Sequence, residues 1–135
     1  MPFMVWNDRI SVGVEAVDRD HKKLVGIINQ LYDAIVARRS KEVLGGLLDE
    51  LTVYSKYHFD REEQFFHATG YGDAAQHTRQ HSDFTRQVKG IRERYRSGSA
   101  GLNLEVMNFL KDWLFDHILA SDSKFGPHLN AMGIR

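Results

Sequence analysis

The sequence contains no cysteine, and this absence excludes several kinds of site at once. Without thiols the chain can form no disulfide, no thiolate nucleophile and no iron–sulfur cluster. The common structural zinc sites, which rely on cysteine, are excluded for the same reason. Any metal ion in this protein must therefore be held by nitrogen and oxygen ligands.

The chain also lacks net charge at pH 7, because its 18 basic and 18 acidic side chains cancel. Nothing in this balance attracts nucleic acid, and no nucleic-acid partner is expected. No run approaches 18 apolar residues, and the start, MPFMVWNDRI, lacks the basic and apolar regions of a signal peptide. We therefore expect no membrane insertion and a cytoplasmic location.

The length and composition predict one globular domain over residues 1–135, since 42% of the residues are hydrophobic and 27% are charged. Four segments carry apolar residues at spacings of three and four, which is typical of amphipathic helices. They cover about residues 18–37, 41–68, 74–95 and 103–122, followed by a C-terminal tail, residues 123–135. Four helices with short connections predict an all-α fold, an antiparallel up-down-up-down four-helix bundle.

The predicted helix ends carry residues that favour starts and stops. Asp18 is expected to cap the first helix, and Gly70 suits the end of the second. Asp73 followed by Gln76 resembles a capping box at the start of the third helix. The first 17 residues have no helical period, but their apolar side chains, including Trp6, would be costly to leave in water. This segment is therefore expected to form an ordered N-terminal arm against the bundle.

Two of the seven histidines lie four positions apart in the stretch HTRQH, residues 77 to 81. A helix turns by about 100° per residue, so His77 and His81 lie about 40° apart and project from the same face. Alone, this spacing fits both a chance pair on a solvated face and a metal site. The positions of the other histidines decide between these two interpretations.

Three more histidines fall on the inward apolar faces of the predicted helices. His58 lies one turn before Glu62 in the second predicted helix. His117 continues the apolar stripe of the fourth predicted helix, and His21 begins the apolar stripe of the first. Each predicted helix thus contributes at least one candidate ligand. The other two histidines are expected at the surface: His67 lies about 180° round the helix from His58, and His128 follows the Gly126–Pro127 break.

Five imidazoles and a glutamate in one small core need partners. Each unpaired buried polar group would cost roughly 1–3 kcal/mol. The sum would consume most of the roughly 5–15 kcal/mol of stability that a domain has. Divalent metal satisfies all of these groups together, and six or more donors suggest two ions that share a carboxylate bridge.

Two carboxylates are candidates for the bridge: Glu62, and Asp122 in the stretch HILASD. Asp122 follows His117 by five residues, which corresponds to about 140° beyond a full turn of a regular α-helix. The two side chains can converge only if the helix contains a π-type or terminal distortion. Spacing alone does not establish Asp122 as a ligand.

In order and spacing, these residues resemble the ligand pattern of the hemerythrins and look like those of a bacteriohemerythrin. The resemblance covers essentially the whole chain, including the Trp6–Asn7 arm and the stretch SVGVEAVDRDH that leads into the first histidine. The residues that match the pattern are His21, His58, Glu62, His77, His81, His117 and Asp122.

The resemblance implies reversible dioxygen binding at a non-haem centre of two iron ions with a bridging oxo or hydroxo group, for oxygen transport, storage or delivery. One iron would be held by His77, His81 and His117, the other by His21 and His58, with Glu62 and Asp122 bridging. The second iron would keep an open position for dioxygen, or for a small anion in the ferric form. Leu24, Leu114, Trp113 and Trp6 are expected to wall this oxygen pocket, although each also fits ordinary core packing.

The ligand set favours binding over substrate oxidation, because five neutral imidazoles and two carboxylates should stabilise high-valent iron less than a carboxylate-rich set. Two other functions stay open at this point. One is a di-iron redox enzyme that handles oxygen, peroxide or nitric oxide; the other is a sensor or delivery module with an unidentified protein recipient. Imidazole and carboxylate also bind zinc and manganese, so the sequence does not determine which metal is present.

Overall fold

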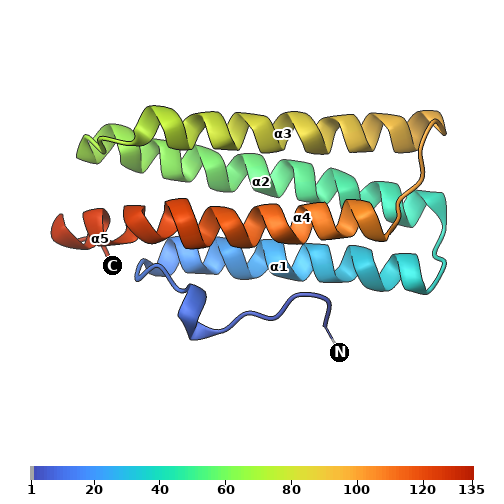
Figure 1. Cartoon of the computed structure of the whole chain (residues 1–135), viewed down its shortest axis with the longest axis horizontal. Coiled ribbons are helices and arrows are strands. Elements are labelled where there is room, and N and C mark those ends of the chain that lie inside the picture. The colour runs from blue at the N-terminus through green and yellow to red at the C-terminus, as the bar shows by residue number, and fades with distance from the viewer. Residues whose placement is uncertain (1) are drawn as a thin grey trace.

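Helices account for most of residues 2–135, which are the residues that the computed structural model describes. The four long helices are α1 (Glu15–Val36), α2 (Lys41–Thr69), α3 (Ala74–Ser97) and α4 (Leu104–His117). They alternate in direction and form a four-helix bundle, and residues 2–135 contain no strand (Figure 1). The predicted all-α four-helix bundle is therefore confirmed. None of the helices described is both long and apolar enough to cross a bilayer.

Beyond the bundle the chain continues in helical form. A short π-helix, η2 (Ile118–Asp122), joins α4 directly to α5 (Ser123–Ala131), which extends past the end of the bundle (Figure 1). The sequence predicted only a C-terminal tail at 123–135, and residues 123–131 of this tail form α5. Pro127 lies inside α5, although the sequence pattern placed a helix break there.

The helix ends agree with the sequence in part. Gly70 ends α2 with a left-handed backbone at φ 65°, where glycine meets no steric penalty. Asp73 makes no capping hydrogen bond with its side chain, so the predicted capping box with Gln76 is wrong. Asp18 is not an N-cap either, because α1 begins at Glu15. Instead, the Asp18 carboxylate accepts hydrogen bonds from Val12 N and Ser11 Oγ and so ties the arm to α1.

The N-terminal arm packs along α1 and contains a 3-10 turn, η1 (Asp8–Ile10). Met4 is buried, and its backbone N–H and carbonyl both bond to the side-chain amide of Asn29, at 2.7 and 2.9 Å. Phe3 stacks on Tyr32 with ring centroids 4.4 Å apart. Further along, the arm passes under α5, where Val12 lies against Gly126. The arm therefore links the first and last helices of the chain.

Replacing Gly126 with alanine should destabilise the protein. A Cβ at this buried position would lie 2.0 Å from the carbonyl oxygen of Val12, so the arm or α5 must move. Overpacking of this kind typically costs about 1–3 kcal/mol in the free energy of unfolding, measured by chemical denaturation. The matched control is Gly46→Ala in α2, where a Cβ meets nothing within 4 Å. That change should raise the free energy of unfolding by about 0.5–1 kcal/mol. Equal effects at the two glycines would contradict a steric clash at Gly126.

Candidate metal centre

The five inward histidines and the two carboxylates singled out in the sequence lie together in the interior of the bundle. Their ligand atoms form two groups, each with all atoms within 4.8 Å of one another. One group consists of Glu62, His77, His81 and His117, and the other of His21, His58, Glu62 and Asp122. Glu62 belongs to both groups, so the geometry provides for two adjacent ions that share a carboxylate.

Three histidines from two helices converge in the first group. Nε2 of His117 lies 3.0 Å from Nε2 of His77 and 3.2 Å from Nε2 of His81. Oδ1 of Asp122 lies 2.8 Å from His77 Nε2 and 3.3 Å from His117 Nε2. Asp122 therefore presents one carboxylate oxygen to the three-histidine side.

The second group uses the remaining oxygen of the same carboxylate. Oδ2 of Asp122 lies 2.9 Å from Nε2 of His21. Glu62 Oε1 lies 2.8 Å from Nε2 of His58 in this group and 3.4 Å from Nε2 of His81 in the other. Both carboxylates thus stand between the two histidine sets, which is the arrangement that a bridging ligand requires.

The π-helix η2 brings Asp122 into the site. His117 ends α4 and Asp122 ends η2, and both side chains are buried and face the same cluster. A regular α-helix would separate two residues five apart by about 140°, whereas the wider π turn narrows this angle. The distortion that the sequence spacing required is present at residues 118–122.

The side chains satisfy a physical test for metal binding. Within residues 2–135, both nitrogens of His21, Nε2 of His58 and all four carboxylate oxygens of Glu62 and Asp122 are buried and make no hydrogen bond of acceptable geometry, although several of these atoms lie within 3 Å of a neighbour in the cluster. Each such group would cost about 1–3 kcal/mol if it stayed unpaired. Imidazole nitrogens and carboxylate oxygens are the ligands that divalent first-row metals such as iron, manganese and zinc accept. These residues therefore fit a pair of such ions.

One of the candidate ligand histidines is hydrogen-bonded, through the ring nitrogen that faces away from the cluster, to a buried carboxylate that the sequence pattern did not reveal. His58 Nδ1 donates to Asp20 Oδ2 at 2.9 Å, and Asp20 is itself buried. Tyr54 and Arg61 donate to the same carboxylate, at 3.0 and 2.8 Å. Such a contact fixes the ring so that Nε2 keeps its lone pair for a metal. Asp20 directly precedes His21 in the sequence, but no local pattern distinguishes it from a solvated aspartate.

Two further histidines have hydrogen-bond acceptors that the sequence also did not reveal. His81 Nδ1 donates to Glu63 Oε2 at 3.2 Å, and His117 Nδ1 donates to Gln80 Oε1 at 2.8 Å. Both acceptors directly adjoin a candidate ligand in the chain, at Glu62 and His81 respectively. Three of the five histidines are therefore oriented by a second polar side chain.

The protonation of the site follows from its burial and its opposing charges. Burial raises the pKa of Asp122 and of Glu62, but the neighbouring histidines outweigh this effect and lower both values. The pKa of Asp122 falls well below its usual range, chiefly through His117. Burial lowers the pKa of His58, yet the Glu62 carboxylate and the hydrogen bond to Asp20 raise it to about 10. Without metal, ionised carboxylates and a protonated His58 therefore stabilise one another at pH 7.

Metal loading at pH 7 should accordingly release protons. A cation that takes the place of the His58 proton expels it, so the affinity for metal should rise with pH. Adding Zn²⁺ to the metal-free protein in a weakly buffered solution with a pH indicator measures this release. The His58→Ala variant should release fewer protons per ion bound, and loading without acidification would show that His58 is already neutral.

The residues expected to wall an oxygen pocket lie in different surroundings. Leu24 and Leu114 are buried, one turn from His21 and His117 respectively. Trp113 is partly buried and stacks on the ring of His117, with centroids 4.6 Å apart. Trp6 lies in the arm, where the Lys22 ammonium stands 5.3 Å from its ring centre. Their role at the pocket stays a prediction.

The two histidines expected at the surface differ from one another. His67 is exposed near the end of α2. His128 is only partly exposed: its Nε2 shares a hydrogen bond of 2.9 Å with Thr69 Oγ1, and its ring lies 5.0 Å from that of Tyr71. The prediction that His128 is an ordinary surface residue is wrong, because α5 packs back onto the end of α2.

A four-helix bundle with five buried histidines and two buried carboxylates between them has the fold and the donor set of a helical-bundle metal-binding protein. Residues 12–129 match the family model described as the hemerythrin HHE cation binding domain. The chain belongs to the hemerythrin family.

Individual relatives agree with this assignment. The chain is 32% identical to a bacteriohemerythrin of Pseudomonas aeruginosa, with 93% of this chain and 80% of the relative covered. It is 30% identical to one of Methylococcus capsulatus, with 97% and 100% covered. The crystal structure of a wild-type hemerythrin superimposes with a TM-score of 0.89 at 30% identity, covering 94% of this chain and 98% of the other. The similarity therefore extends over nearly the whole length.

Proposed function

We propose that this protein binds dioxygen reversibly at a non-haem di-iron centre and serves as an oxygen carrier, store or delivery protein. The observation that carries the proposal is the buried donor set, with its two groups of ligand atoms joined through carboxylates. His77, His81 and His117 would hold one iron, and His21 and His58 the other. Glu62 and Asp122 would bridge them, because each carboxylate lies between the two histidine sets.

The unequal number of histidines supports a binding function. Three imidazoles serve one position and two serve the other, so the second iron would keep a coordination position for an external molecule. When bound, the two irons supply that open position and the two electrons that reversible dioxygen binding requires. The protein's own part is to orient the histidines and to exclude water from the site.

The buried neighbours support oxygen binding rather than catalysis on a larger substrate. Leu24 and Leu114 are 2% and 3% exposed, so little room remains beside the ligands for a bulky molecule. A chain with this site is an oxygen-binding protein in our proposal and not an enzyme.

Anaerobic optical titration with oxygen tests the proposal. Iron is added to the metal-free protein without oxygen, the iron content is measured, and dioxygen is then added and removed in cycles. We expect about two irons per chain and an absorption band that appears with oxygen and disappears on its removal. Irreversible oxidation in the first cycle, or turnover with peroxide or nitric oxide, would favour a redox enzyme instead.

A further inference from the structure

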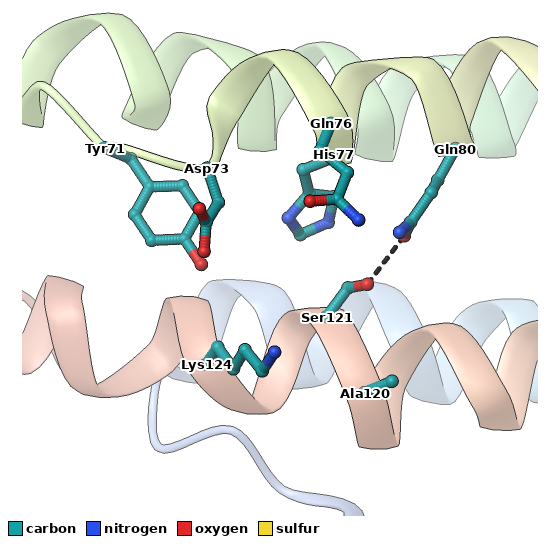
Figure 2. Close-up of a pocket in the computed structure, with 8 residues that line it drawn as sticks. All are labelled: Tyr71, Asp73, Gln76, His77, Gln80, Ala120, Ser121 and Lys124. Atoms are coloured by element: carbon teal, nitrogen blue, oxygen red, sulfur yellow. Dashed lines mark hydrogen bonds between the residues drawn. The ribbon is translucent and has the colours of Figure 1, made fainter.

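Gln80 lies between the two histidines of the HTRQH stretch and reaches away from α3 toward α4 and η2. Its side-chain oxygen accepts two hydrogen bonds, from Nδ1 of His117 at 2.8 Å and from Oγ of Ser121 at 2.6 Å. Figure 2 shows the contact between Gln80 and Ser121 across the gap between the helices. One atom of α3 thus contacts both the end of α4 and the π turn.

The first hydrogen bond determines which nitrogen of His117 is free for a metal. Nε2 of His117 faces the cluster, where it lies 3.3 Å from Asp122 Oδ1. A neutral imidazole carries one proton, so a lone pair on Nε2 requires that the proton be on Nδ1. The Gln80 oxygen accepts that proton and therefore holds both the tautomer and the ring orientation that metal binding needs.

The second hydrogen bond acts on the other ligand of this segment. Ser121 directly precedes Asp122 in η2, and the position of Asp122 depends on the π turn. A carbonyl oxygen has two lone pairs, so Gln80 can accept from Ser121 and His117 at the same time. The same atom therefore positions His117 directly and Asp122 through the backbone of its neighbour.

Gln80 and Ser121 also line two hollows that reach the site. One has a volume of about 40 Å³ and is lined by His77, Tyr71 and Lys124, among others (Figure 2). The other has a volume of about 240 Å³ and is lined by residues that include His117. Both hollows share Gln80, Ala120 and Ser121 as lining residues.

We propose that Gln80 is a positioning residue of the metal centre, which orients His117 and fixes the π turn through one shared oxygen. This inference rests on the proposed metal-binding function and assigns Gln80 a specific part in it. The acceptor is a neutral amide, whereas the corresponding acceptors for His58 and His81 are the carboxylates of Asp20 and Glu63. Gln80 therefore orients its histidine without adding negative charge to the three-histidine side.

The rate of metal loss separates this role from simple packing. Each variant is loaded anaerobically with ferrous iron, and the release of iron to a ferrous chelator is followed by absorbance. Gln80→Leu removes both hydrogen bonds at similar volume, and we expect one of the two irons to leave about 10–100-fold faster. Gln80→Glu keeps an acceptor oxygen and should release iron at a rate close to that of the parent. Ser121→Ala removes one bond and should fall between them.

Gln76 provides a matched control because it lies on the same helix and lines the smaller hollow, but is exposed. Gln76→Leu should release iron like the parent. Circular dichroism of the metal-free variants verifies the fold, and Gln80→Ala replaces Gln80→Leu if helix content falls. Equal release by parent and Gln80→Leu would overturn the proposal, and so would fast release by Gln80→Glu.

A second measurement does not depend on iron. In the zinc-loaded parent, the Nδ1 proton of His117 should give a ring N–H signal that exchanges slowly with water, and Gln80→Leu should abolish its protection. A protected signal that persists in Gln80→Leu would overturn the positioning role. A parent that binds zinc but not two irons would contradict the proposed function while leaving the role of Gln80 testable with zinc alone.

Discussion

The His77→Ala variant should lose iron at the three-histidine position and retain about one iron per chain or less. His77 Nε2 lies within 3.0 Å of His117 Nε2 and within 2.8 Å of Asp122 Oδ1, so its ligand atom stands at the centre of the first group. Removing it leaves an incomplete donor set and a buried gap beside the ionised Asp122. His117→Ala should have the same effect, and elemental analysis of the purified, iron-loaded variants measures it.

The control for these ligand variants is His67→Ala, since His67 is exposed. It should keep about two irons per chain, because it removes no buried ligand atom. His128 is a less suitable control, since its hydrogen bond to Thr69 helps α5 pack on α2. A folded His77→Ala or His117→Ala variant with full iron content would show that the three-histidine position is assigned wrongly.

Leu114→Ala should accelerate the autoxidation of the iron-loaded protein while leaving its metal content unchanged. Leu114 is 3% exposed and lies one turn before His117, so its side chain packs in the core beside the site. Truncation at a buried leucine typically lowers the free energy of unfolding by about 2–5 kcal/mol. Truncation also opens space through which water and protons can reach the irons. Optical spectroscopy in air-saturated buffer measures the rate of conversion to the ferric form.

Leu110→Ala separates the effect on the site from the effect on stability. Leu110 is fully buried in α4, one turn further from His117 than Leu114. It should lose a similar amount of stability, about 2–5 kcal/mol, but autoxidise at the parent rate. If Leu114→Ala carries its iron and autoxidises no faster than Leu110→Ala, other residues exclude water, and Leu24 and Trp113 should be tested next.

The bundle and the central cluster could be predicted because they follow from local periodicity. His77 and His81 share a helix face by their spacing alone, and His58 and Glu62 do so in the same way. Asp122 required more than periodicity, since its five-residue distance from His117 fits only a distorted helix. The resemblance to a known family supplied that residue, and the π turn at 118–122 gives the physical reason.

Other features depend on contacts between distant parts of the chain, so no local pattern could reveal them. Asp20, Glu63 and Gln80 have the polar character of solvated helix residues, and only the packing of neighbouring helices makes them acceptors for candidate ligand histidines. Gly126 next to Pro127 resembled a helix break. In the structure the glycine is needed because the Val12 backbone passes too close for any side chain.

The π turn has a consequence for changes in the length of the chain. A π turn holds one residue more than the α-helical turn that it replaces, so every later residue is offset by about 100° around the axis. Asp122 and the face of α5 that meets Val12 both lie beyond this point. Deleting a single exposed residue there, such as Ala120, would let the segment close into a regular α-helix in which the aspartate follows His117 by four residues and lies about 40° from it, so both would keep their direction. A change that converted the turn to a regular α-helix without removing a residue would instead turn the Asp122 carboxylate and the α5 contact with the N-terminal arm away together.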